Sequence, residues 1–216
     1  QTGKLSWQPA PAVTGDDTVL RPAAEPFAAT GGLRLLQGNL GRAIVKASAV
    51  PEEAWIIRAP AKVFDSQEAL VNAYKAQQLN QDFVAVVINQ GPQANGMPEL
   101  HQFTPVLGSL MSAGYKVALV TDGRMSGASG KVPAALHVSP EVVQGGPLGK
   151  VCDGDLIELN VHTGELRALV DEAVWAARPL RAASVKTTYG LGRELFSAQR
   201  RLVSAPEQGA SSLFLD

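Results

Sequence analysis

Apolar residues in this chain gather in short runs that are separated by loops rich in glycine and proline. Residues 83–88 (FVAVVI) and 117–120 (VALV) are continuous apolar runs bounded by polar residues, which is the pattern of strands buried on both faces. Stretches 67–78 and 98–113 repeat apolar residues at i, i+3 and i+4, so we expect a helix in each. Strand, loop and helix therefore alternate through the middle of the chain, as in α/β domains.

Local signals predict where the helices begin. Ser66 precedes the first helix as an N-cap. Glu99 falls in the first turn of the second helix, where the macrodipole favours a carboxylate. Ser139 would cap a short helix that ends at residues 145–146, and a last amphipathic helix is expected over residues 189–203.

Short alternating or β-branched segments predict further strands. We place them within residues 31–41 and at residues 43–47, 56–63, 150–152, 156–161 and 166–170, the last two joined by a hairpin. Pro60 lies inside one of these segments. Since proline lacks an amide donor, it predicts a sheet edge or a bulge at that point.

The two buried strands each run into a loop with glycines and small polar side chains. Residues 89–100 (NQGPQANGMPEL) follow the first strand, and residues 121–130 (TDGRMSGASG) follow the second. If the strands are neighbours in one parallel sheet, both loops open at the same edge, where α/β proteins bind ligands. Glu99 would then face Ser126, which has Asp122 and Arg124 on either side to position or polarise it.

Each of these features also has an ordinary structural explanation. Residues 121–130 are equally consistent with a polar turn, and Glu99 with a carboxylate that caps its helix. The functional alternative for Glu99 is a ligand of Mg²⁺, because one carboxylate beside open coordination positions suits this ion. His101 is expected on the helix surface, His137 packed in a loop and His162 in a turn, with no spacing typical of zinc ligands.

Charge and cysteine content exclude several classes of function. The chain has 19 Lys+Arg against 20 Asp+Glu, so it lacks the basic footprint of a nucleic-acid-binding protein. No apolar run approaches the roughly 20 residues that span a bilayer. The single cysteine, Cys152, excludes an internal disulfide and cannot by itself build a zinc or iron–sulfur site. We expect a soluble cytoplasmic protein that binds neither nucleic acid nor membranes.

The beginning of the chain differs from the rest. Residues 1–26 are rich in proline, alanine and threonine, with Trp7 as the large anchor. We expect an N-terminal arm or linker over residues 1–26 and a globular domain over residues 27–216. A natural chain begins with methionine, so Gln1 suggests a processed chain or a piece of a longer protein.

Several blocks together resemble the dihydroxyacid dehydratase/phosphogluconate dehydratase family. Residues 118–129 (ALVTDGRMSGAS) are similar to the second signature of that family, and the other blocks follow in its order and spacing: 31–40, 63–65, 96–99 (GMPE), 137–147 and 153–155. The resemblance covers the chain from about residue 27 onward. The run SGASGKVPAA and the tail block GRELF resemble the 6-phosphogluconate dehydratase branch of the family.

The resemblance implies a hydro-lyase that removes water from a 2,3-dihydroxy acid, here 6-phospho-D-gluconate. Ser126 would be the base that takes the C2 proton, acting as an alkoxide stabilised by positive charge. Glu99 would be a ligand of Mg²⁺, and Arg124, Ser129 and Lys131 would contact the substrate. The alternatives are another dihydroxyacid or sugar-acid dehydratase, or a docking or ligand-binding module of the same fold without activity.

The cysteine content limits how much of such an enzyme this chain contains. Family members are longer and hold an iron–sulfur cluster, 4Fe-4S in this branch, through cysteines of an N-terminal domain, whereas Cys152 is the only cysteine here. The resemblance therefore implies the C-terminal domain alone, an α/β, β-barrel-like swivelling domain with flanking helices, as in aconitase-like enzymes. Cys152 is expected to be a buried structural thiol rather than a cluster ligand.

The same resemblance implies partners and cofactors outside this chain. We expect the N-terminal cluster-binding domain of the same parent chain, a second copy in a homodimer and a sugar-acid phosphate as partners. The cluster and Mg²⁺ would belong to the full-length enzyme, and the fragment alone would bind neither and be inactive.

Overall fold

The structure, a computed structural model, describes residues 3–125, 131–181, 190 and 192–213, which fall into two units, residues 1–31 and 32–216. In the first unit the described residues form neither helix nor strand. The guanidinium of Arg21 lies 4.5 Å from the centre of the Phe27 ring. The Trp7 side chain is 89% exposed, so it is not an anchor within this unit.

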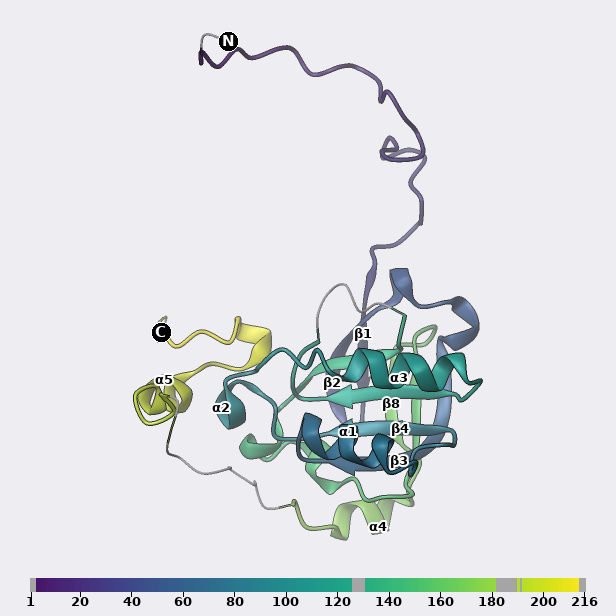
Figure 1. The fold of residues 1–216 in the computed structure, drawn as a ribbon, viewed down its shortest axis with the longest axis vertical. Helices are drawn as coiled ribbons and strands as arrows, with labels where there is room; N and C mark the ends of the chain where they lie inside the picture. Colours follow the sequence, from purple (N-terminus) through teal and green to yellow (C-terminus); the bar gives the residue numbers. More distant parts are fainter. Residues whose placement is uncertain (1–2, 126–130, 182–189, 191, 214–216) are drawn as a thin grey trace. The chain divides into compact units, whose positions relative to one another are not determined.

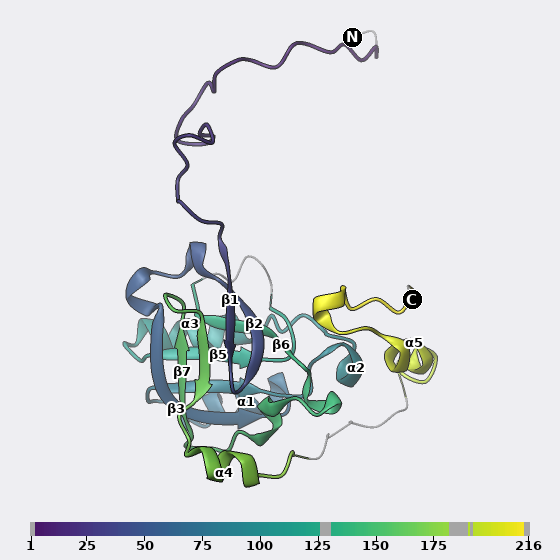
Figure 2. The ribbon, with the colours of Figure 1, turned by 180° about the vertical axis from the view of Figure 1, so that it is seen from behind.

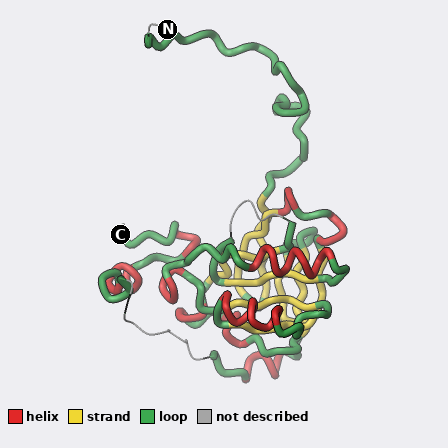
Figure 3. The backbone as a smooth tube through the Cα atoms, viewed as in Figure 1, coloured by secondary structure: helices red, strands yellow, loops and turns green. Residues whose placement is uncertain are grey.

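In the second unit, eight strands of the described residues close into a barrel (Figures 1 and 2). In chain order they are β1 (Leu33–Gly38), β2 (Gly41–Lys46), β3 (Ile56–Phe64), β4 (Phe83–Val87), β5 (Val117–Thr121), β6 (Ala134–Ser139), β7 (Leu156–Asn160) and β8 (Glu165–Ala168). Around the barrel the order is β1-β2-β6-β5-β4-β3-β7-β8. The helices are α1 (Gln67–Lys75), α2 (Pro92–Asn95), α3 (Phe103–Ser112), α4 (Glu172–Ala177) and α5 (Ser197–Leu202), drawn in red in Figure 3.

The barrel joins a parallel half to an antiparallel half. β3, β4, β5 and β6 run parallel, with Val84 opposite Ala118 in the β4–β5 register. Antiparallel pairs connect β6 through β2 to β1, and β3 through β7 to β8. A parallel contact between Gln37 of β1 and Glu165 of β8 closes the ring.

Two apolar cores explain why the central strands are apolar throughout. Val84 and Val86 of β4 point into the barrel interior, whereas Phe83, Ala85 and Val87 belong to a second core that includes residues of α1 and α3. All five side chains are buried. Because the barrel interior covers one face of the parallel strands and α1 and α3 cover the other, alternation of polar and apolar residues disappears.

Pro60 does not mark a sheet edge, because β3 lies between β4 and β7. It is paired with Leu156 at the end of the β3–β7 register, and pairing with β4 begins at the next residue, Ala61. The missing amide of the proline therefore falls where the strand passes from one neighbour to the other.

The second predicted helix begins later than expected, and Glu99 lies outside it. α3 begins at Phe103, so the expectation that Glu99 sits in a helical first turn, or merely caps the helix, is wrong. The backbone of Glu99 instead forms a parallel bridge with Arg124, and the Leu100 amide donates to the Arg124 carbonyl at 3.0 Å. This pairing keeps the segment extended. The first helix is predicted more closely, with Ser66 Oγ accepting from the Ala69 amide, although it ends at Lys75.

Three further predictions near the carboxyl half are corrected. Ser139 is the last residue of β6, opposite Arg42 of β2, rather than a helix N-cap, and a 3₁₀ turn follows at Val142–Gln144. Residues 150–152 form no strand, since a 3₁₀ turn covers Pro147–Lys150. The expected terminal helix is reduced to α5, with turns at residues 192–196, while residue 189 lies outside the described residues.

None of the helices in the described part of the chain is long and apolar enough to cross a membrane.

Replacement of Gly38 by alanine should weaken barrel closure. An added Cβ would lie 2.0 Å from the carbonyl oxygen of Leu166, so β1 and β8 would have to separate. We expect Gly38→Ala to lower the free energy of unfolding by about 1–3 kcal/mol in a denaturant titration. The matched control is Gly108→Ala in α3, where nothing lies within 4 Å of the added Cβ; it should raise stability by about 0.5–1 kcal/mol. Equal stabilities for Gly38→Ala and the unmodified chain would contradict the packing argument.

Candidate functional site

The segment after β5 packs tightly against the loop that follows β4. Thr121 is fully buried, and its Oγ1 accepts from the Gly123 amide at 3.0 Å. A Cβ on Gly123 would lie 2.7 Å from Cβ of Gln90 and 3.0 Å from the Leu100 side chain. Glycine at this position therefore allows the two loops to touch. Because β4 and β5 are parallel neighbours, the prediction that both loops open at one edge of the sheet is confirmed.

Asp122 holds three backbone amides with one buried carboxylate. Its Oδ1 accepts from the Gln90 amide at 2.8 Å. Its Oδ2 accepts from the amides of Asn89, at 3.1 Å, and Val142, at 3.2 Å. Burial raises the pKa of Asp122 to about 6, and the Glu141 carboxylate acts in the same direction, while the three amides oppose the shift. Asp122 therefore ties together the chain segments that follow β4, β5 and β6.

The contacts of Asp122 show a structural role that the sequence did not predict. The side chain is 0% exposed, and both carboxylate oxygens are engaged by amides. The described contacts thus make Asp122 a structural clamp, while its predicted role towards Ser126, which lies outside the described residues, stays a prediction.

Glu141 is a second buried carboxylate that sequence reasoning missed. Its two oxygens accept from the amides of Gln93, at 2.9 Å, and Ala94, at 3.1 Å, in the first turn of α2. Burial raises its pKa, and these two amides oppose the shift. A Cβ on Gly91 would lie 2.3 Å from Oε2, so this glycine lets the loop approach the carboxylate. The sequence signals available for Glu141 were its place directly after Ser139-Pro140 and inside the family-like block 137–147.

Glu99 and Arg124 lie side by side where the two loops meet. Their backbones form the parallel bridge described above. Nε of Arg124 donates to the Met97 carbonyl at 3.0 Å, and Nη1 lies 3.9 Å from Oε2 of Glu99. The two side chains are 45% and 42% exposed, so the ion pair is weak. Both charged groups are therefore available to a ligand at this edge of the barrel.

The other predicted site residues are placed less fully. Ser126 and Ser129 lie outside the described residues, so their assignments stay predictions. Lys131 is exposed in a turn. His101 is exposed, as predicted, with Nδ1 3.3 Å from the Glu99 carbonyl. His137 lies in β6 rather than in a loop, and burial, followed by the charge of Arg124, lowers its pKa.

The described residues fit one metal ligand, not a complete metal site. Among them no group of three or more His, Cys, Asp or Glu could hold a metal ion. Glu99 presents a half-exposed carboxylate whose ion-pair partner is 3.9 Å away. A hard cation such as Mg²⁺ binds few carboxylates and takes its other ligands from water or substrate. Glu99 therefore suits a single oxygen ligand whose companions come from outside the described residues.

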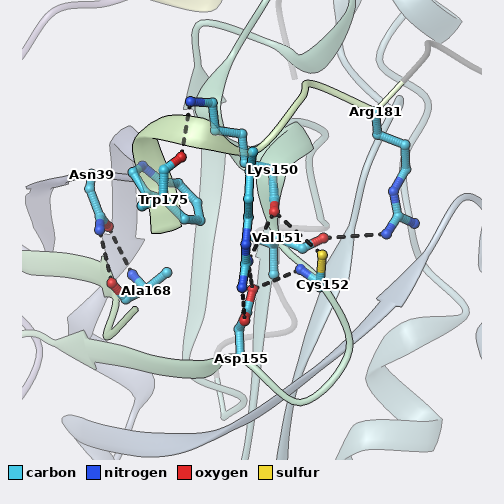
Figure 4. A network of polar contacts seen from close by, with 9 residues as sticks. Asn39, Lys150, Val151, Cys152, Asp155, Ala168, Trp175 and Arg181 are labelled. Atoms are coloured by element: carbon cyan, nitrogen blue, oxygen red, sulfur yellow. Dashed lines mark hydrogen bonds and ion pairs between the residues drawn. The ribbon is translucent and has the colours of Figure 1, made fainter. Parts of the chain in front are cut away.

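Cys152 is exposed, so the prediction of a buried thiol is wrong. It follows a 3₁₀ turn, and its Sγ lies 3.7 Å from the Lys150 carbonyl (Figure 4). Its amide donates to Asp155, which also pairs with Arg178. Burial alone would raise the pKa of Asp155, but the hydrogen bonds from Arg178 and from the Cys152 amide, together with the charge of Arg178, lower it overall. The thiol thus sits on a surface turn that is held by an ion pair.

The sequence is similar to a known family and to several curated proteins. A family described as "Dihydroxy-acid/6-phosphogluconate dehydratase C-terminal" matches residues 18–210. The chain is 54% identical over 212 residues to the phosphogluconate dehydratase of Pseudomonas aeruginosa, 55% to that of Zymomonas mobilis and 51% to that of Escherichia coli K12. Each match covers 98% of this chain but 35% of the relative. The chain thus spans about a third of the length of the curated relatives it matches.

Burial of Asp122 should leave a signature in the pH dependence of stability. Its pKa is about 6 in the folded state, against an ordinary value of 3.8, so between these values the folded state binds more protons than the unfolded state. The contribution of this group to stability therefore falls as the pH rises from about 4 to about 6, by at most about 1.4 kcal/mol per pH unit.

Asp122→Asn removes this contribution. We expect the unfolding free energy of the unmodified chain minus that of the variant to decrease between pH 4 and pH 6 and then level off, as measured by denaturant titration. Glu141 titrates in both proteins, so its effect largely cancels in the difference. A difference that stays flat or grows with pH would contradict the raised pKa.

Proposed function

This chain belongs to the dihydroxy-acid/6-phosphogluconate dehydratase family, and from that membership we propose that it acts as the C-terminal domain of a 6-phosphogluconate dehydratase. The full-length enzyme would eliminate water from 6-phospho-D-gluconate to give 2-dehydro-3-deoxy-6-phosphogluconate, a step of the Entner–Doudoroff pathway. Identity favours this branch. Phosphogluconate dehydratases match at 47–55% over 90–99% of the chain, whereas a dihydroxy-acid dehydratase of Ignicoccus hospitalis matches at 41% over 79%.

The observation that carries the proposal is the backbone bridge between Glu99 and Arg124. It joins the GMPE block to the TDGR block at one edge of the barrel, with a carboxylate and a guanidinium half-exposed. A negatively charged sugar acid suits this pair, because Arg124 attracts its carboxylate and Glu99 provides an oxygen ligand for a cation that the substrate shares.

The candidate residues of this chain would have different parts in the reaction. Ser126 would take the C2 proton, and a serine can do so only where positive charge stabilises its alkoxide. Arg124 lies two positions before it, and Arg124, Ser129 and Lys131 would contact the substrate. When bound, the iron–sulfur cluster and Mg²⁺ of the full-length enzyme supply Lewis acidity towards the leaving hydroxyl. The exposed Cys152 is not assigned to the cluster.

The rest of the enzyme would belong to the parent protein. The cluster-binding partner would be an N-terminal domain of the same chain, in a cytoplasmic homodimer, and the isolated fragment would be inactive. The closed α/β barrel is consistent with a swivelling domain of the aconitase-like type, which would carry the Glu99 edge towards the cluster.

The proposal is tested in the full-length enzyme by assay of 6-phosphogluconate dehydration. Ser126→Ala should lower kcat by about 10²–10⁴-fold because the proton acceptor is lost. Glu99→Gln should raise the Mg²⁺ concentration needed for half-maximal activity, since an amide binds the cation more weakly than a carboxylate.

The matched control is Glu172→Gln, which removes an exposed carboxylate from the first turn of α4 and should leave both quantities unchanged. Full activity of Ser126→Ala would refute the assignment of the base. No activity of the unmodified enzyme on 6-phosphogluconate would refute the proposed function itself.

A further inference from the structure

The carboxyl-terminal segment forms part of a cavity close to the Glu99–Arg124 pair. Figures 1 and 2 both place α5 beside α2. A cavity of about 160 Å³ is lined on one side by Pro92, Gly96 and Met97, and on the other by Arg200, Ser212 and other residues of the terminal segment. The carbonyl of Met97 accepts the hydrogen bond from Nε of Arg124. One residue thus belongs both to the cavity wall and to the candidate site.

Two arginines of this segment have no carboxylate partner among the described residues. Nη1 of Arg193 donates to Oδ1 of Asn95 at 2.9 Å, and Nη2 of Arg200 donates to the Arg193 carbonyl at 3.0 Å. Neither takes part in the ion pairs of the described structure. The Nε atoms of both are buried without a hydrogen-bond partner.

Of these two arginines, Arg200 lines the cavity, and its positive charge is not offset there by a carboxylate of the described residues. Arginine presents its donors as a planar fork that matches the oxygens of phosphate. Ser212, a residue with a neutral hydroxyl donor, lines the same cavity. The wall therefore offers a cation and a neutral donor without a competing carboxylate among its lining residues.

We propose that the cavity between α2 and the terminal segment binds the phosphate group of the substrate, with Arg200 as the main contact. This inference rests on the proposed function, which supplies a substrate with a carboxylate at one end and a phosphate at the other. The Glu99–Arg124 pair then receives the sugar-acid end, and Met97 lies between the two subsites. Arg200 selects for phosphorylated sugar acids over unphosphorylated ones.

The test compares Arg200→Gln with Arg201→Gln in the full-length enzyme. Arg201 is the next residue of α5, is exposed and does not line the cavity, so it controls for the loss of one positive charge. Arg200→Gln should raise KM for 6-phosphogluconate, and the inhibition constant of inorganic phosphate, by roughly 10–100-fold. The inhibition constant of gluconate and kcat should change by less than about twofold. Arg201→Gln should change none of these quantities.

A third variant keeps the test decisive if Arg200→Gln unfolds. Arg200→Lys retains the charge but loses the planar fork, so its KM should lie between those of the unmodified enzyme and Arg200→Gln. Equal weakening of phosphate and gluconate inhibition would show that Arg200 has only a structural role. Unchanged phosphate inhibition in both Arg200 variants would show that Arg200 does not contact phosphate. Either result overturns the inference.

Direct calorimetric titration with inorganic phosphate separates this inference from the proposed function. It needs no turnover, so it reports on the cavity even if the unmodified enzyme does not dehydrate 6-phosphogluconate. Phosphate binding that is lost in Arg200→Gln and kept in Arg201→Gln supports the subsite. Absence of phosphate binding in an enzyme that does turn over 6-phosphogluconate overturns it.

Discussion

The three hydrogen bonds that Asp122 accepts from backbone amides decide where the candidate site lies. They connect the segments that follow β4, β5 and β6, three parallel strands whose ends would otherwise lead into independent loops. Glu141 likewise accepts hydrogen bonds from two backbone amides in the first turn of α2. Buried carboxylates carry a desolvation cost, which explains the raised pKa of Asp122 and Glu141. The amides offset part of this cost, and the result is a fixed path for the chain from β4 to Glu99.

Barrel closure provides the rigid frame behind these loops. The parallel half resembles an open α/β sheet, because its strands are covered by α1 and α3 on one face and by the barrel interior on the other. The antiparallel half closes the ring, so the described strands leave no free edge along which other chains could pair. Rigid strands and fixed loop ends together suit a site that must hold a small charged substrate.

The charges of the site are arranged in two regions with different exposure. Glu99 and Arg124 form a loose, half-exposed ion pair, and a ligand that separates the two side chains loses little interaction energy. Arg193 and Arg200, by contrast, are partly buried with Nε atoms that lack acceptors. An elongated dianionic or trianionic substrate would satisfy both regions at once. Within the described residues, both charged regions lie near Met97, which lines the cavity and accepts from Arg124.

The sequence by itself determined the elements whose patterns are local. The apolar runs of β4 and β5 predicted two doubly buried parallel strands, and Ser66 predicted the start of α1, because burial and capping depend on neighbouring residues. The family membership also followed from short blocks. Only the tertiary structure decided that Glu99 is extended rather than helical, since a bridge to Arg124, distant in sequence, competes with local helix propensity. Likewise, the contacts of Asp122 and Glu141 and the position of Arg200 in a cavity wall depend on other segments of the chain, which no local pattern encodes.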